Sequence, residues 1–392
     1  MPHAQQKAVL SNFRLLFVLP VFFYSATALA QGFSVQFNGY AKNLGIWSTT
    51  ILTSEVAPKE RYFLNISRFR AKGLLDLSHF LHAEIWLDNE LLTGDFLETF
   101  DFQFGESLQR PTFADLEWKV KQGRRYRLQQ SFFRAFATLY LKNIELTIGR
   151  QRIAWGTGYV WNPTDLLNPF NPAAVELDEK QGVDAAYLVV PLGSLSRIEG
   201  VYAPGRKQLQ SSAAFRVSSH LGEYDFSIMA GDFQSDKVLG GDFAGYLGGA
   251  GLRGEFTFTW KKAGDNFFRA ILNADYNFSH DIYVFAELYF NGQGRTNKKN
   301  YEVADLFSGQ TFNLARHYLA LSGNKNLTPL LALSFYSIMN LNDRSCLLGP
   351  ALTYSLATNL EVTASAYFFM GANDSEYGLL ENSYFAYMQY YF

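Results

Sequence analysis

The sequence contains a single cysteine, Cys346, so its 392 residues can form no internal disulfide. Charge is nearly balanced, with a formal net charge of -2, which gives no reason to expect a nucleic-acid partner. Histidine occurs six times, and neither an H-E-x-x-H nor a G-x-S-x-G motif is present. We therefore expect a protein that is not an enzyme, takes no cofactor and holds no metal ion.

Long hydrophobic runs are also missing, apart from one near the N-terminus. There, Lys7 and Arg14 precede a short apolar core, which ends in the small-x-small sequence Ala28-Leu29-Ala30. This pattern predicts a secretory signal peptide over residues 1–30 and a mature chain of residues 31–392. An uncleaved membrane anchor is the alternative, although the apolar core is short for a spanning helix. No later stretch reaches about 18 apolar residues, so we expect no transmembrane helix in the mature chain.

What the sequence has is aromatic residues, 17% of the chain, and short segments in which apolar and polar residues alternate. In residues 251–260, Leu252 and Phe256 share one face, while Arg253 and Glu255 share the other. About eighteen such segments follow one another, each with the period of a two-faced strand. A sheet in lipid must close on itself, because every backbone N–H and C=O needs a partner. The sequence therefore predicts an all-β fold, a transmembrane antiparallel up-and-down barrel of about 18 strands, with 16–18 as the range.

The connections between these segments alternate between short and long. Short ones fall near residues 142–143, 248–250 and 279–281, and long ones near 92–128 and 155–181. Barrels of the bacterial outer membrane have short periplasmic turns and long outer loops, whereas a soluble sandwich has no reason to separate loop lengths. We therefore expect the cell outer membrane of a Gram-negative bacterium. One segment is awkward, because Pro350 cannot donate to a ladder; its strand should start later or carry a bulge.

The last ten residues form an alternating segment that ends on an aromatic residue. Tyr390 and Phe392 share one face with Tyr384 and Met388. This ending resembles the closing strand of Gram-negative outer-membrane proteins, and the resemblance implies that the barrel-assembly machinery recognises it. An apolar terminal strand without that role is the alternative.

Residues 144–172 combine a strand pattern with a stiff loop. Ile144, Leu146 and Ile148 alternate with polar residues, and three Asn-Pro steps follow that prevent a longer strand or helix. The loop at 155–181 is aromatic enough to pack rather than move freely. It would either fold into the lumen and narrow the pore or form a lid on the outer rim. The constriction-loop candidates are Trp155, Tyr159, Trp161, Asn162, Asp165, Asn168 and Phe170.

The polar faces of the strands carry charges of both signs. Charged groups facing lipid are costly, so we expect them in the lumen or at its rim. Arg150 and Arg152 are in phase with the lipid-facing Ile148, and either a bulge at Gly149 or a position above the membrane would resolve this conflict. The pore-lining candidates are Arg68, Arg70, Lys72, Arg134, Glu145, Arg150, Arg152, Arg253, Glu255, Arg269, Asp275 and Glu287.

Two interpretations of these charges stay open. An arginine ladder would attract anionic solutes at a constriction, whereas paired charges would only support the wall. The long loop at 92–128 also carries a basic run from Lys119 to Arg127, which could contact lipopolysaccharide phosphates or draw anions to the mouth. A solvated loop without either role is the simpler alternative.

One set of residues carries a family resemblance. Arg134-Ala135-Phe136, followed by Gly149-Arg150-Gln151 and Trp155-Gly156, resembles a pattern in alginate-export-type porins and in a related group of uncharacterised proteobacterial outer-membrane proteins. The resemblance covers about a third of the chain. It implies an 18-stranded monomeric channel with an arginine-lined lumen, and no exported polysaccharide is carried over.

We expect an outer-membrane channel, or porin, for passive passage of small hydrophilic, anionic or sugar-like solutes. Its expected partners are outer-membrane lipid, lipopolysaccharide, the barrel-assembly machinery and the solutes. The first alternative is a structural or surface-polysaccharide-associated barrel whose lumen is plugged by loops. An outer-membrane enzyme is the second, disfavoured because three of the six histidines, His79, His220 and His280, sit in expected turns and His3 in the expected signal peptide.

Overall fold

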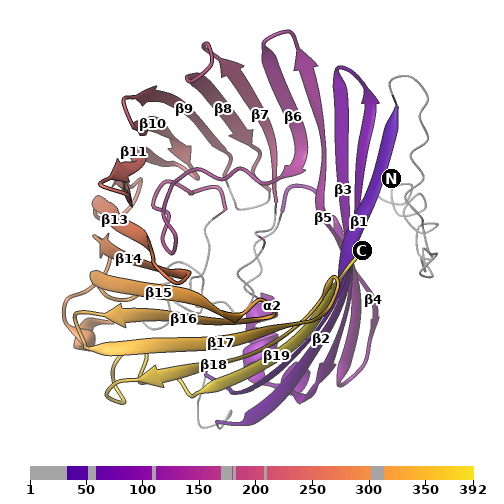
Figure 1. Cartoon of the computed structure of the whole chain (residues 1–392), viewed down its shortest axis with the longest axis vertical. Helices are drawn as coiled ribbons and strands as arrows, with labels where there is room; N and C mark the ends of the chain where they lie inside the picture. The colour runs from indigo at the N-terminus through magenta and orange to yellow at the C-terminus, as the bar shows by residue number, and fades with distance from the viewer. Residues whose placement is uncertain are drawn as a thin grey trace.

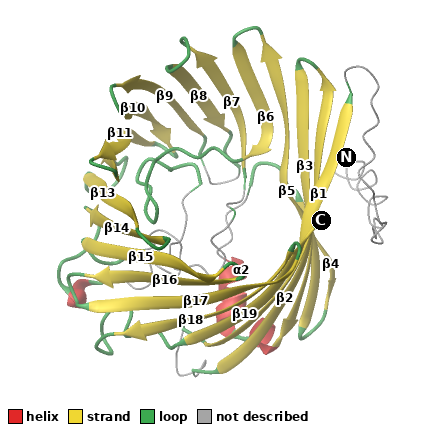
Figure 2. Ribbon diagram, in the orientation of Figure 1, coloured by secondary structure: helices red, strands yellow, loops and turns green. Residues whose placement is uncertain are grey.

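The computed structural model describes residues 33–51, 59–107, 112–168, 179, 182–206, 210–301 and 313–392. The signal peptide expected at residues 1–30 lies outside them. Among the described residues, no helix is long and apolar enough to cross a membrane. Most of the described chain consists of antiparallel strands arranged around a central space (Figures 1 and 2).

Eighteen strands in the described part of the chain close into one barrel, as the alternating pattern predicted. Each strand pairs with the next along the chain, and the last pairs with the first. The strands are β1 (Ser34–Thr49), β2 (Arg61–Ser78), β3 (Leu81–Gly94), β5 (Tyr126–Leu141), β6 (Ile144–Gln151), β7 (Val183–Pro191), β8 (Arg197–Ala203), β9 (Ser212–Leu221), β10 (Tyr224–Phe233), β11 (Asp236–Leu247), β12 (Ala250–Trp260), β13 (Phe267–Phe278), β14 (Ile282–Asn291), β15 (His317–Thr328), β16 (Leu331–Asn340), β17 (Ser345–Ala357), β18 (Leu360–Met370) and β19 (Ser383–Tyr391).

One further strand, β4 (Glu117–Gln122), is not part of the closed ring. The ring passes directly from β3 to β5, and β4 pairs with residues 127–131 of β5, beyond the end of the shorter β6. Two short helices precede it, η1 (Asp95–Glu98) and α2 (Phe100–Ser107); a third, η2 (Lys298–Asn300), lies after β14. The sequence pattern predicted none of these four elements, because each is too short to establish a period.

The connections separate by length between the two ends of the barrel. At one end, the short-turn end, each connection is two to five residues long, for example residues 79–80 and 192–196. At the other, the long-loop end, most are longer, including residues 95–125, 152–182 and 371–382. Two short links, 234–235 and 341–344, also occur there. The first and last strands meet at the closing seam, where the Gly39 N–H donates to the Phe392 carbonyl at 3.0 Å and the Phe392 N–H to the Gly39 carbonyl at 3.1 Å.

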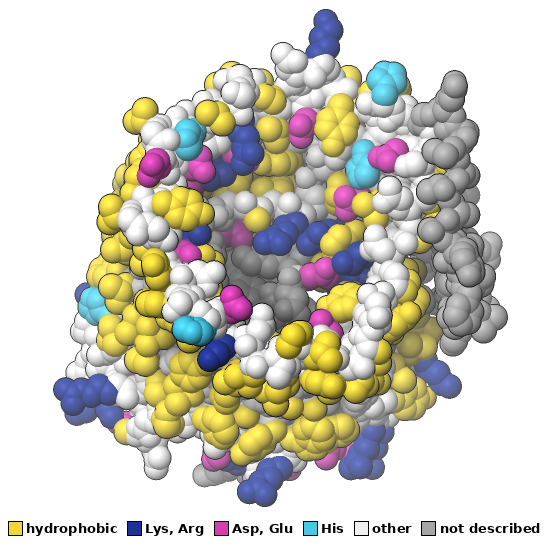
Figure 3. All heavy atoms as spheres, in the orientation of Figure 1, with side chains coloured by type: hydrophobic (Ala, Val, Ile, Leu, Met, Phe, Trp, Pro, Cys, Tyr) yellow, Lys and Arg dark blue, Asp and Glu magenta, His cyan; other side chains and the backbone are white. Residues whose placement is uncertain are grey.

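The two faces of the strands differ as a membrane barrel requires. On the exterior face of β12 to β14, Phe256, Leu272 and Leu288 are 45–51% exposed although they are large and apolar. Apolar side chains cover much of the outer surface in Figure 3, whereas charged side chains gather in its central hollow. A closed sheet with an apolar exterior leaves no backbone group unpaired in lipid. The lumen face is therefore where polar function is expected.

The expectation for Pro350 was wrong in its detail. Strand β17 neither starts later nor bulges at this point; it runs through Gly349 and Pro350 in unbroken register, and only their pairs with β18 are missing. The proline has no N–H to give, so the ladder is interrupted locally. The hydroxyl of Ser365 donates to the Pro350 carbonyl at 3.0 Å and satisfies one of the freed groups.

Candidate functional site

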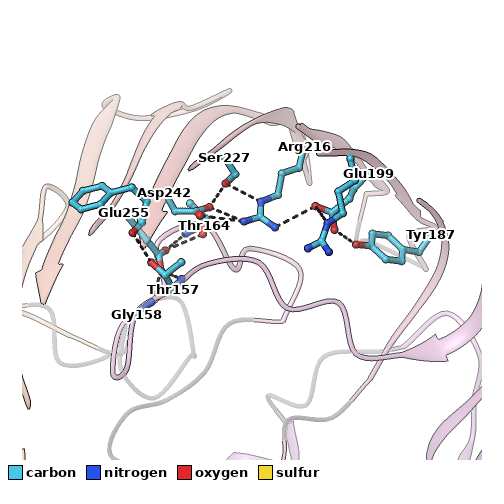
Figure 4. A network of polar contacts seen from close by, with 11 residues as sticks. Thr157, Gly158, Thr164, Tyr187, Glu199, Arg216, Ser227, Asp242 and Glu255 are labelled. Atoms are coloured by element: carbon cyan, nitrogen blue, oxygen red, sulfur yellow. Dashed lines mark hydrogen bonds and ion pairs between the residues drawn. The ribbon is translucent and has the colours of Figure 1, made fainter. Parts of the chain in front are cut away.

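The loop after β6 is held inside the barrel by a carboxylate on the opposite wall. Glu255 of β12 is 3% exposed and accepts hydrogen bonds from the loop backbone. Its donors are Gly158 N–H at 2.6 Å, Thr164 N–H at 3.2 Å and Thr164 hydroxyl at 2.8 Å, with a further short bond from Thr157 N–H. Figure 4 shows the loop backbone bent around this carboxylate.

Backbone conformation contributes to that close approach. Gly156 has a φ of +104°, and a Cβ there would lie 2.7 Å from the Glu255 carboxylate and 2.8 Å from the Thr164 hydroxyl. Both the positive φ and the crowding favour glycine. The Trp155-Gly156 pair of the sequence motif is thus the point where the loop turns onto the wall.

A second carboxylate, Glu287 of β14, binds the next part of the loop. It is 0% exposed and accepts from the N–H groups of Tyr159 at 2.7 Å, Val160 at 3.2 Å and Trp161 at 2.7 Å. The Asn273 side chain donates to it at 3.1 Å. Two buried carboxylates therefore bind the backbone of residues 157–164. Each would be costly to bury without such donors.

Aromatic stacking reinforces the attachment. The Trp161 ring stacks on Tyr289 with centroids 5.0 Å apart, and its indole N–H donates to the Asn313 side chain at 2.9 Å. The Tyr159 ring stacks on Phe285 at 4.6 Å. Of the other candidates, Trp155, Asn162, Asp165 and Asn168 are in the described loop, with Trp155 3% and Asp165 4% exposed. Phe170 lies outside the described residues.

Four predicted basic residues gather on the facing wall formed by β2, β3 and β5. Arg70 pairs with Asp88 through bonds of 2.6 and 2.5 Å, and Arg68 bonds Glu90 at 2.5 Å. The guanidinium of Arg134 and the ammonium of Lys72 each lie 4.0 Å from the centre of the Trp86 ring. Arg152, just beyond β6, lies close enough to Arg134 to repel it electrostatically. We call Arg68, Arg70, Lys72, Arg134 and Arg152 the basic wall.

The far end of the loop reaches this basic wall. Glu179 contacts Arg70 and accepts from the Lys72 ammonium at 2.8 Å. Residues 157–164 of the same loop are bound to β12 and β14, on the other side of the lumen. The described parts of the loop therefore contact both sides of the barrel. Figure 1 shows the segment that follows β6 inside the ring of strands.

The remaining pore-lining candidates are more dispersed. Arg253 pairs with Asp275 and lies 4.7 Å from the Tyr159 ring, so both face the loop. Arg269 bonds Gln293 and lies over Phe267. Glu145 is exposed near the short-turn end of β6.

Arg150 requires a correction, because the structure does not place it in the lumen. It is paired with Ala135 and Asp184, on the same exterior face as Ile148. It is nevertheless only 1% exposed, because residues 112–116 fold over it. Its guanidinium bonds Asp184 at 2.9 Å and the Ala114 carbonyl at 2.8 Å. The register is continuous through Gly149, so no bulge turns the Arg150 side chain toward the lumen. The covering segment shields this exterior charge and supplies a hydrogen-bond acceptor.

A second charged cluster was missed by the sequence analysis. Arg216 of β9 bonds Glu199 at 3.2 Å and Asp242 at 3.0 Å, and Ser227 donates to the same aspartate (Figure 4). Tyr187 bonds Glu199. The signal was present, since Arg216 is a charged residue flanked by the apolar Phe215 and Val217 in a strand segment. These groups are buried and mutually paired, so they stabilise the wall rather than face a solute.

The loop of residues 371–382 forms another inward contact, at the long-loop end. Glu376 is 4% exposed and accepts from the Tyr318 hydroxyl at 2.6 Å, Asn340 side chain at 2.6 Å and Leu314 N–H at 3.0 Å. Next to it, Tyr377 packs into a cluster of lumen-facing apolar side chains. The buried members of that cluster include Leu44, Ile46, Leu64, Tyr289, Tyr318, Ile338, Leu347, Tyr367 and Phe385.

Docking of this loop should depend on pH. Burial raises the pKa of the Glu376 carboxyl from 4.5 to about 7. The docked loop thus binds the proton more readily than a released one, so docking is strongest below pH 4.5 and weakens as the pH rises through 7. We expect residues 371–382 to exchange amide hydrogens faster at pH 8 than at pH 6, after correction for intrinsic rates. Glu376→Gln should remove this difference; equal protection of the unaltered protein at both pH values would contradict the prediction.

Comparison with known proteins gives the fold. No family model and no curated protein matches the sequence. OccK11 (OpdR) of Pseudomonas aeruginosa matches in structure with a TM-score of 0.54 and 12% identity, over 94% of this chain and 98% of that one. OccAB1 of Acinetobacter baumannii gives 0.56 and 10%, over 94% and 99%. A doubly substituted OccD1 (OprD) gives 0.57 and 11%, over 94% and 99%.

The fold is that of the outer-membrane porins. The prediction of a porin-like Gram-negative barrel is therefore confirmed for the fold. At this level of identity the three neighbours show the architecture of the chain and nothing of its role or location. At 10–12% identity they carry no information about which solute this chain would take.

Proposed function

We propose that this protein is an outer-membrane channel through which small hydrophilic anions, including acidic sugars, pass without energy input. The observation that carries the proposal is the pairing of two features in one lumen: a loop bound across it and a basic wall beside the remaining space. Carboxylates of Glu255 and Glu287 fix the loop, and its Glu179 reaches Arg70 and Lys72. A fixed loop would set the size of the pore, and charges beside it would select by sign.

The partners of the charged side chains in the lumen favour an anion over a cation as the permeating solute. The Glu255 and Glu287 carboxylates accept hydrogen bonds from backbone N–H groups of the loop. These bonds offset their negative charge, so the two carboxylates are poor sites for a passing cation. On the basic wall, Arg134 and Lys72 flank the face of Trp86, Lys72 also bonds Glu179, and Arg152 lies near Arg134. Neighbouring cations repel one another, and an anion between them relieves that repulsion. The paired-charge interpretation applies best to Arg70 with Asp88 and to Arg216.

Single-channel recording tests this proposal. Refolded or detergent-extracted protein would be inserted into a planar bilayer, and the reversal potential measured under a salt gradient. We expect stable openings and a reversal potential of the sign given by anion permeation. Openings that prefer cations would contradict the proposed anion selectivity but would still support channel activity.

A specific observation favours a second candidate, a structural barrel with a plugged lumen. The aromatic cluster under Tyr377 fills lumen space toward the long-loop end, where Glu376 attaches loop 371–382. Absence of conductance from a correctly folded barrel would favour this candidate. Selective openings at pH 6 and pH 8 alike would exclude it, because a plug could not be the resting state.

The proposal includes the expected surroundings of an outer-membrane protein. Lys119 and Lys121 on β4 are exposed and could contact lipopolysaccharide phosphates, while Arg124 and Arg125 share the Glu98 carboxylate. Phe392 is 46% exposed and stacks on Phe69 at 5.4 Å, so its ring remains on the barrel exterior. Recognition of this end by the barrel-assembly machinery stays a prediction.

A further inference from the structure

Within the described strands, the wall of the barrel has a break in its ladder between β17 and β18. The two strands keep one register on either side of the break, but two neighbouring pairs are missing. The missing pairs are Gly349 with Tyr367 and Pro350 with Ala366, and we call this place the window. Proline has no N–H to donate to β18, and its carbonyl accepts from the Ser365 hydroxyl at 3.0 Å.

The window lies at the level that lipid would surround. On the exterior face, Met370 lies beyond it toward the long-loop end and Tyr354 toward the short-turn end, and they are 44% and 43% exposed. Every exterior side chain of β17 and β18 is apolar. Hydrocarbon cannot satisfy a freed backbone group, and proline is otherwise confined to sheet edges and bulges. A break at this level is therefore costly unless it has a use.

The wall is thin at the window, because most of its side chains are small. The small residues are Gly349, Pro350 and Ala351 on β17 and Ser365 and Ala366 on β18. The large group here is the Tyr367 ring, which lies on the lumen side. A Cβ on Gly349 would lie only 3.0 Å from that ring, so the ring rests against the Gly349 backbone. The Tyr367 ring thus covers the window from within.

Apolar surface lies directly behind the window in the lumen. Tyr367 belongs to the lumen-facing apolar cluster, and its ring meets the Phe385 ring edge-on with centroids 4.9 Å apart. Leu347, two residues before Gly349, is a buried member of the same cluster. Tyr336 lies across from Gly349 in the ladder and packs against the cluster. The apolar lumen surface and the lipid-facing exterior are therefore separated here by one ring and a broken ladder.

We propose that the window is a lateral passage through which small apolar molecules move between the lumen and the surrounding lipid. Transfer of an apolar molecule from water to the cluster, and from there to hydrocarbon, is favourable. Passage through a complete ladder would break backbone hydrogen bonds in lipid, whereas two pairs are already absent at the window. Rotation of the Tyr367 ring would complete the opening. A charged solute does not suit this route, because the exterior side chains of both strands are apolar, so the inference does not rest on the proposed anion channel.

A reversible crosslink across the window tests the passage. In a Cys346→Ser background, Gly349→Cys with Tyr367→Cys places two thiols at opposed positions of the window, and oxidation joins the two strands there. The matched control is Thr353→Cys with Thr363→Cys on the same two strands. There the ladder is complete and the two hydroxyls lie 2.8 Å apart. The probe is N-phenylnaphthylamine, a neutral apolar dye that fluoresces in lipid, added to intact cells of a Gram-negative host that makes the protein.

Oxidation should close the passage in the window pair alone. We expect it to lower the initial rate of dye uptake at least about threefold, because a joined wall leaves no route into lipid. Reduction should restore the rate, and the control pair should show no change. Single-channel conductance should be equal in the oxidised and reduced window pair, since the wall and not the pore is altered. Equal dye rates in both redox states of the window pair, or an equal fall in both pairs, would overturn the proposal.

A second variant closes the window without a crosslink. Pro350→Val supplies the N–H that proline lacks, and valine suits a strand. We expect the barrel to fold, judged by heat-modifiable migration, and the amides of residues 350 and 366 to be protected from hydrogen exchange. Dye uptake should fall as it does in the oxidised window pair. A folded variant with these amides protected and the original rate of dye uptake would show that the broken ladder carries no passage.

Discussion

Replacing Glu255 and Glu287 together by glutamine is expected to raise single-channel conductance at least about twofold, because it removes charge-assisted bonds that hold the loop in the lumen. Each carboxylate presents two acceptor oxygens, and both oxygens of each one receive donors from residues 157–164. A glutamine would set an NH2 group against backbone N–H donors on one side. The loop should then leave the wall for part of the time.

The effect should appear in the loop before it appears in the current. We expect amides of residues 157–164 to lose protection from hydrogen exchange in the double variant. Asp242→Asn is a matched control, since Asp242 is a buried wall carboxylate that bonds Arg216 and Ser227 rather than the loop. Conductance and exchange that match the unaltered protein, in a variant that still migrates as a folded barrel, would contradict the attachment of the loop through these two residues.

The strands were predictable from the sequence because successive side chains of a strand point to opposite faces. In a barrel wall, apolar and polar residues therefore alternate. In β12, Arg253 and Glu255 alternate with Leu252 and Phe256, and the structure assigns these pairs to lumen and exterior. Short elements such as the helix α2 and the strand β4 were not predicted, because each has too few residues to show a hydrophobic period.

The loop attachment could not have been derived in the same way. Glu255 and Glu287 were picked as lumen residues by phase, but their partners are backbone groups about a hundred residues distant in the chain. Only the closed ring brings β12 and β14 opposite β6. For Arg150, the alternation correctly predicted a position in phase with the lipid-facing Ile148. The segment that covers it, residues 112–116, could not be predicted because it has no periodic pattern.

Removing two charges from the basic wall should have the second large effect. In Lys72→Gln combined with Arg134→Gln, we expect the anion-to-cation permeability ratio to fall about tenfold. A unit charge about 4 Å from a permeating ion is worth about 1 kcal/mol in water and more near protein, so two such losses are readily measured as a reversal potential. Both side chains flank Trp86 at 4.0 Å, and glutamine keeps much of their length.

The matched control removes the same charge from the exterior. Lys237 and Lys325 lie on the exterior face of β11 and β15, so Lys237→Gln with Lys325→Gln changes net charge equally without touching the lumen. We expect this control to keep the original ratio. High salt should reduce the selectivity of the unaltered protein toward that of the lumen variant, because screening at about 1 M acts within about 3 Å. If both double variants shift the reversal potential alike, selectivity comes from the overall charge of the molecule and the basic wall has no special part in it.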